Sequence, residues 1–155
     1  MRKIIALVGA AGAAAAVAAI ALGGFAVAGE ASAAERDFSG RGELYARGSG
    51  IANLAGDGFV EIHGFGAGTV VVCGAERIEA RGDGSRTALP DGCVRFVGWK
   101  GGIRAAGDDM RVHMEGRRIE FIAGGEGSVH LKGHGVFKVN GHSGRWTPEG
   151  VEVRF

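Results

Sequence analysis

The sequence predicts an all-β domain that follows a hydrophobic N-terminal segment. Glycine supplies 31 of the 155 residues, against a usual share of about 7%, and only two residues are proline. Apolar and polar residues alternate over long stretches after residue 35, as in strands with one buried face. No window in that part shows the 3.6-residue period of a helix. We therefore expect strands throughout the chain beyond its N-terminal segment.

The N-terminal segment has the pattern of an export signal. Met1-Arg2-Lys3 is a positively charged start, and residues 4–29 carry no charge. The small residues Ala31-Ser32-Ala33-Ala34 then suit a signal peptidase that cuts after Ala33 or Ala34. The uncharged run also exceeds the roughly 20 residues that span a bilayer, so an uncleaved anchor helix is the alternative. In both cases the positive start places the rest of the chain outside the cytoplasm.

The length and the net charge of the chain limit its domain organisation and its possible partners. We expect a signal peptide or membrane anchor over residues 1–33 and a single glycine-rich β domain over residues 34–155. Removing the first segment takes away two of 18 basic residues and one of 17 acidic ones, which leaves 16 of each. A domain with no basic excess does not suit nucleic acid. Membrane contact is expected only through residues 4–29, if they stay uncleaved.

Glycine-rich turns are expected to divide the domain into short strands. Gly56-Asp57-Gly58, Gly82-Asp83-Gly84 and Asn140-Gly141 have the composition of tight hairpin turns. The alternating segments between such turns predict strands near residues 43–47, 51–55, 59–63, 69–73, 77–81, 93–97, 110–114, 117–122, 128–132, 136–139 and 150–154.

Two architectures accommodate these strands. About 10–12 short strands at regular spacing favour an antiparallel sandwich or a small closed barrel. The alternative is a β-solenoid, in which the glycines form the corners of each coil. A unit of the form Gly-x-Gly-x-apolar-x-apolar recurs, and its two copies match when Gly58 is aligned with Gly127. The register is lost between Arg86 and Asp109, so the antiparallel architectures are preferred.

The two cysteines, Cys73 and Cys93, stand twenty positions apart. An even cysteine count in an exported chain predicts a disulfide. Closing a loop of this size stabilises a fold by roughly 3 kcal/mol in the chain-entropy model. The C-x-x-C spacing of a thiol catalyst or a metal site is absent.

Several motifs resemble those of a group of small exported bacterial proteins with glycine-patterned strands. The resemblance rests on Leu89-Pro90-Asp91-Gly92, Val97-Gly98-Trp99-x-Gly101 and Val139-Asn140-Gly141-x-x-Gly144-x-Trp146. It implies an all-β fold, and no activity is known for the group. A looser similarity of composition links the chain to adhesin-like β-solenoid head domains of bacterial surface proteins.

Few residues are candidates for binding chemistry. His130 and His134 are weak metal-ligand candidates, although two residues four apart on a strand are separated by roughly 13 Å. Trp99 and Trp146 are weak candidates for a sugar-binding face, and packing in the core explains them as well. We expect no cofactor.

No sequence motif assembles a catalytic site. A Gly-x-Ser-x-Gly elbow and a phosphate-binding loop are both missing. The sequence therefore favours a non-enzymatic, secreted or envelope-associated domain with a structural or interaction role. An extracellular β-barrel that binds a glycan or a metal is the alternative.

Overall fold

The computed structural model describes residues 42–63 and 67–155. The expected signal or anchor helix and its cleavage sites lie outside these residues. The described part has no helix long and apolar enough to cross a membrane. Its six strands are β1 (Gly42–His63), β2 (Gly68–Cys73), β3 (Arg77–Ala88), β4 (Val94–Val139), β5 (His142–Trp146) and β6 (Val151–Arg154).

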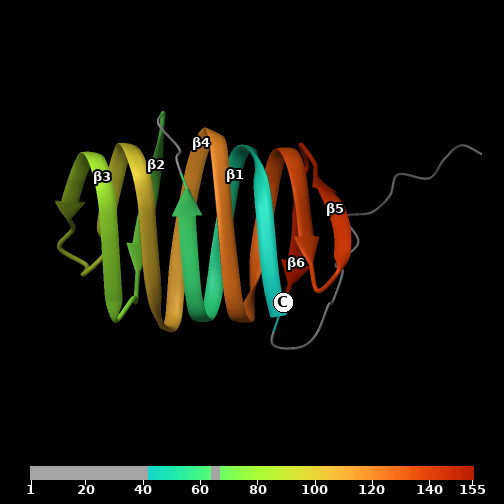
Figure 1. Ribbon diagram of the computed structural model, residues 1–155, viewed down its shortest axis with the longest axis horizontal. Coiled ribbons are helices and arrows are strands. Elements are labelled where there is room, and N and C mark those ends of the chain that lie inside the picture. Colours follow the sequence, from blue (N-terminus) through green and yellow to red (C-terminus); the bar gives the residue numbers. More distant parts are fainter. Residues whose placement is uncertain (1–41, 64–66) are drawn as a thin grey trace, which may run out of the picture. The chain divides into compact units, whose positions relative to one another are not determined.

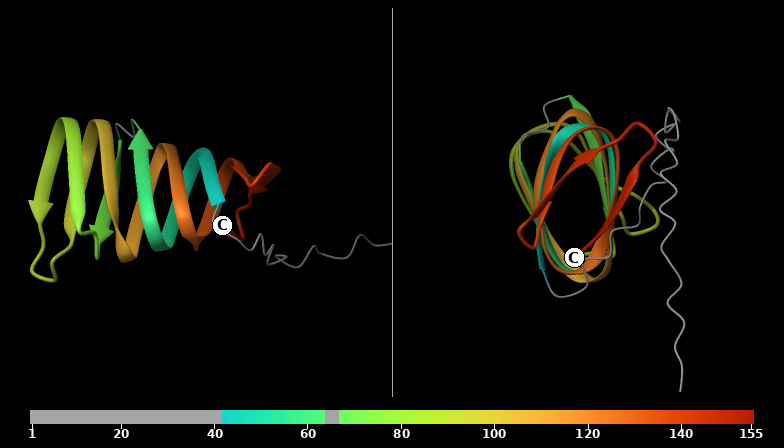
Figure 2. Two further views of the ribbon diagram at one scale, coloured as in Figure 1. Left: turned by 60° about the horizontal axis from the view of Figure 1, so that its bottom comes forward. Right: turned by 90° about the vertical axis from the view of Figure 1, so that its right-hand side faces the viewer.

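All six strands belong to one antiparallel sheet that is organised around β4. This strand is 46 residues long and pairs with each of the other five. The ribbon of the described domain winds repeatedly around one axis (Figures 1 and 2). Strands β1, β2 and β3 form a first arm, the turn at residues 89–93 reverses the chain, and β4 returns as a second arm.

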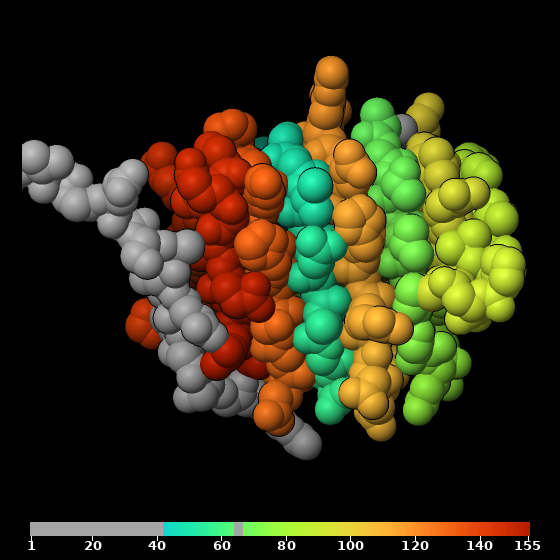
Figure 3. Space-filling view, turned by 180° about the vertical axis from the view of Figure 1, so that it is seen from behind, coloured from blue at the N-terminus to red at the C-terminus, as the bar shows by residue number. Residues whose placement is uncertain are grey.

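The two arms interleave, so that each coil of one arm lies between coils of the other. Gly125 of β4 pairs with both Gly42 and Gly58. The stretch of β1 from Gly42 to Gly58 therefore makes one full coil, and β4 passes between its two ends. Gly50 of β1 likewise pairs with two separate residues of β4. Figure 3 shows the resulting alternation of sequence-distant segments across one face. We call this architecture the coiled hairpin.

The expectation of an all-β, antiparallel domain is confirmed. The small closed barrel is wrong, because the sheet does not close on itself. The chain also follows the coiled path of the solenoid alternative, but with antiparallel neighbours. The loss of register between Arg86 and Asp109 has a simple cause, since the reversing turn lies within that stretch.

Two of the three predicted hairpin turns are corners inside continuous strands. Gly56-Asp57-Gly58 lies within β1 and Gly82-Asp83-Gly84 within β3, so the predicted short strands merge into longer ones. Only Asn140-Gly141 makes a true hairpin, between β4 and β5, with both residues at positive φ. At a corner the strand bends but stays paired with the neighbouring strands on both sides. At a hairpin the chain reverses and pairs with the segment that directly precedes the turn.

The corners require glycine because strands approach one another closely there. Gly50 has φ of 137°, and a Cβ at this position would overlap the carbonyl oxygen of Lys132. It pairs with Gly133 on one side and Gly116 on the other, and Gly116 pairs in turn with Gly68. The glycines therefore stack in a column along the coil, which only residues without a side chain can do.

The core fills the inside of the coil with apolar side chains. Alternate residues of each straight segment point inward, such as Leu44 and Ala46 in β1 or Phe121 and Ala123 in β4. No polar or charged residue of the described part is buried. Ionisable groups of the described domain consequently lie on its outer surface.

Candidate functional site

The predicted disulfide partners lie together at the reversing turn. The sulfur atoms of Cys73 and Cys93 are 2.02 Å apart, and the structure describes no free cysteine. Within the turn, the Cys93 amide donates to the Asp91 carboxylate at 3.1 Å and the Leu89 amide donates to the Cys93 carbonyl. The cysteine pair thus fastens the turn to the end of β2.

The two tryptophans are buried at opposite ends of the coil. Trp99 is 7% exposed and Trp146 is 4% exposed. Trp99 packs edge-on against Phe96 with ring centroids 5.2 Å apart, while Trp146 lies against Gly48 and Gly135. Neither ring is displayed to solvent, so the structure gives no support to a sugar-binding face made of these residues.

The two candidate metal ligands are held in different settings. His130, on β4, lies beside Glu152 of β6, with Nδ1 3.4 Å from the carboxylate. His134 is exposed at the glycine corner, opposite Ser49. No group of three or more His, Cys, Asp or Glu residues in the described part is arranged to hold a metal ion.

A hollow on the described surface lies between β1 and β4 and encloses about 710 Å³. Three arginines line it, Arg47 from β1 and the adjacent Arg117 and Arg118 from β4, and all three are exposed. Tyr45 and Glu120 lie on the same wall. We call this feature the arginine hollow.

A β-bulge positions two of the three arginines. Gly48 pairs with Ile119 and Gly50 with Gly116, so that Ser49 alone faces the two residues Arg117 and Arg118. The Ser49 hydroxyl donates a hydrogen bond to the Arg117 carbonyl. Bulges of this kind redirect side chains and increase the local twist of a strand. Here the bulge brings two neighbouring arginines to the same hollow as Arg47.

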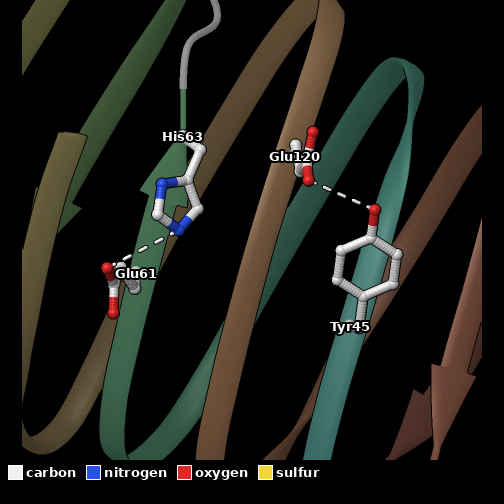
Figure 4. Close-up of polar contacts among 4 residues, drawn as sticks. All are labelled: Tyr45, Glu61, His63 and Glu120. Atoms are coloured by element: carbon white, nitrogen blue, oxygen red, sulfur yellow. Dashed lines mark hydrogen bonds and ion pairs between the residues drawn. The ribbon is translucent and has the colours of Figure 1, made fainter. Parts of the chain in front are cut away.

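The arginine hollow has an excess of positive charge. The Tyr45 hydroxyl donates to Oε1 of Glu120 at 3.2 Å (Figure 4). No described carboxylate lies within ion-pair distance of Arg47, Arg117 or Arg118. One carboxylate therefore faces three guanidinium groups. By contrast, His63 at the end of β1 has a carboxylate partner in Glu61, 3.6 Å away.

A second, smaller hollow of about 400 Å³ lies on the outer surface beside the cysteine pair. His113 Nδ1 lies 2.6 Å from the side-chain oxygen of Asn53 in its wall. Arg111 and Asp91, which also line it, carry opposite charges. This balanced lining gives less selectivity for a charged ligand than the arginine hollow does.

Neither hollow was foreseen from the sequence. The doublet Arg117-Arg118 directly after Gly116 is the only local signal of the arginine hollow. The doublet contributes to the hollow because the single residue Ser49 faces both arginines across the sheet. That pairing cannot be read from the sequence.

Comparison of the chain with protein-family models, with curated proteins and with solved structures found no match. The resemblance to small exported bacterial proteins therefore stays a prediction from the sequence motifs.

Proposed function

We propose that the chain is an exported, non-enzymatic domain that acts as a structural or interaction module outside the cytoplasm. The observation that carries this proposal is the separation of apolar side chains in the interior from charged side chains on the surface. The described coil buries only apolar side chains and keeps its charged side chains outside. A rigid scaffold with a varied outer surface suits binding better than chemistry, which calls for nucleophile and base in hydrogen-bond reach.

Two features support the export part of the proposal. The N-terminal run has the order of a signal peptide, with basic, apolar and small residues in turn. The cysteines lie at bonding distance, and such pairs persist mainly in oxidising compartments.

A glycan-binding role is the second candidate function. It rests on the arginine hollow, which offers cationic side chains beside the ring of Tyr45. The histidines support a metal-binding role less well, because they are dispersed in the described structure.

The mass of the native protein in separate cell fractions tests export. We expect a species in the medium or envelope that starts at Ala34 or Glu35, or a full-length species confined to membranes. Either should be lighter than its reduced form by the two hydrogen atoms lost in a disulfide. A full-length, reduced species in the cytosol would contradict the proposal.

A further inference from the structure

The arginine hollow has the features of a ligand site rather than of an incidental surface depression. Its volume of about 710 Å³ falls in the range of roughly 300–1,000 Å³ that is typical of small-molecule sites. Its arginine side chains lack described carboxylate partners within ion-pair distance. The Ser49 hydrogen bond to the backbone of Arg117 fixes the bulge that presents two of them.

Three guanidinium groups in one hollow select a particular ligand chemistry. The planar fork of arginine donates two parallel hydrogen bonds to a carboxylate, sulfate or phosphate group. One oxyanion can accept hydrogen bonds from more than one arginine, but a ligand with several such groups can engage Arg47, Arg117 and Arg118 through separate oxyanions. The hollow therefore favours a ligand that carries more than one oxyanion.

The positive surface continues from the hollow across the sheet. Val136 of β4 pairs with Arg47 on one side and with Arg145 of β5 on the other. Neighbouring strands are about 4.8 Å apart, so Arg145 and Arg47 stand roughly 10 Å apart on one face. In the next row Lys138 pairs with Tyr45. A linear ligand that crosses these strands would meet Arg145, Val136 and Arg47 in turn, and then Glu120, which pairs with Arg47 on its other side.

The remaining contacts distinguish a sugar polymer from other polyanions. Val136 is 50% exposed and, with the ring of Tyr45, forms an apolar surface on which a sugar ring can lie. The balanced charge of residues 34–155 disfavours nucleic acid, which needs a broad basic surface. We propose that the arginine hollow binds an acidic polysaccharide, with Arg47, Arg117 and Arg118 on its oxyanions and Tyr45 beside a sugar ring. This proposal relies on the proposed function for its extracellular setting.

Calorimetric titration of the native protein tests the proposal. The probes are oligogalacturonate, which carries carboxylates, a sulfated oligosaccharide, neutral dextran oligomers and inorganic phosphate. We expect saturable binding of at least one acidic oligosaccharide that weakens as salt is added, and much weaker binding of dextran and phosphate. The two acidic probes show whether carboxylate or sulfate is preferred. Equal binding of dextran, or equal binding of phosphate alone, would overturn the proposal, as would no binding of either acidic probe.

Matched variants locate the binding site. Arg47→Gln should weaken binding at least about tenfold, since it removes a charge-assisted hydrogen bond to the ligand. The triple change of Arg47, Arg117 and Arg118 to Gln should abolish measurable binding. The control changes Arg77, Arg81 and Arg95 to Gln, which removes the same charge from exposed positions outside the hollow. Equal losses in both triple variants would show general charge attraction and would refute the site.

Two further measurements keep the outcomes distinct. Thermal unfolding of each variant checks that the fold is intact, because all six arginines are exposed. Ser49→Ala removes the hydroxyl that holds the bulge and should weaken binding less than Arg47→Gln does. The cell-fraction masses report on export separately. An exported chain that ignores acidic sugars would refute this inference alone, and a cytosolic chain that binds them would refute the proposed function.

Discussion

The two ends of the coiled hairpin are closed by different means. At the turn end, β3 and the turn at residues 89–93 form one uninterrupted reversal of the chain, and the Cys73–Cys93 pair fastens it to β2. At the terminal end, β5 returns through the Asn140-Gly141 hairpin and β6 follows as a strand of four residues. There Gly127 and Phe155 exchange two backbone hydrogen bonds.

Each end nevertheless buries a tryptophan over the last layer of the core. The indole N–H groups of Trp99 and Trp146 lack a hydrogen-bond partner in the described structure, although buried indoles usually find one. The terminal end has no cross-link in the described structure and is expected to open first, since local opening follows the weakest contacts.

The largest expected loss of stability comes from removing the buried tryptophan side chain at the terminal end. Trp146→Ala should lower the free energy of unfolding by about 3–5 kcal/mol, the usual cost of deleting a buried aromatic ring. Trp146→Phe is the control, because it keeps most of the ring volume and removes the unpaired N–H group. Urea denaturation measures both. Similar losses for the two variants would show that the ring volume does not close this end.

Reducing the cysteine pair should have a smaller and more local effect. Opening the link should cost about 3 kcal/mol in the chain-entropy model. Amide hydrogen exchange should then rise in β2 and β3 and stay unchanged in β5 and β6. Faster exchange at both ends alike would mean that the ends open together, and the contrast between them would disappear.

The smallest effects are expected from the turn glycine at each end. Gly92 and Gly141 have φ of 81° and 83°, and a Cβ at either position would meet nothing within 4 Å. Gly92→Ala and Gly141→Ala should each cost about 1–2 kcal/mol, the penalty of the left-handed conformation. Thermal unfolding measures both. A far larger loss for Gly141→Ala would reveal that the terminal end depends on its hairpin more than its packing indicates.

Local pattern predicted much of this fold. Alternation located the strand segments and the inward residues such as Leu54 and Val129, because a buried face imposes a period of two. Asn140-Gly141 was identified as a hairpin for a sound reason, since both residues adopt positive φ.

The corners were misassigned because a corner and a turn have the same local requirement. Gly56-Asp57-Gly58 needs glycine in either case, and only the neighbouring strands decide whether the chain bends or reverses. The arginine hollow escaped prediction for a related reason. It depends on two residues of β4 facing the single residue Ser49, a register that forms between segments far apart in the sequence.

The interleaving of the two arms constrains how such a chain can change in length. In an ordinary solenoid, one inserted repeat adds one coil. Here each coil of β1 is flanked by β4 on both sides, so an extra coil in one arm would have no partner unless the other arm gained one too. Growth would need the length of two coils, supplied either by one insertion at the turn at residues 89–93 or by two insertions placed symmetrically about it. Duplication of a segment within one arm alone cannot supply this, so the number of coils should be harder to alter than in a repeat protein.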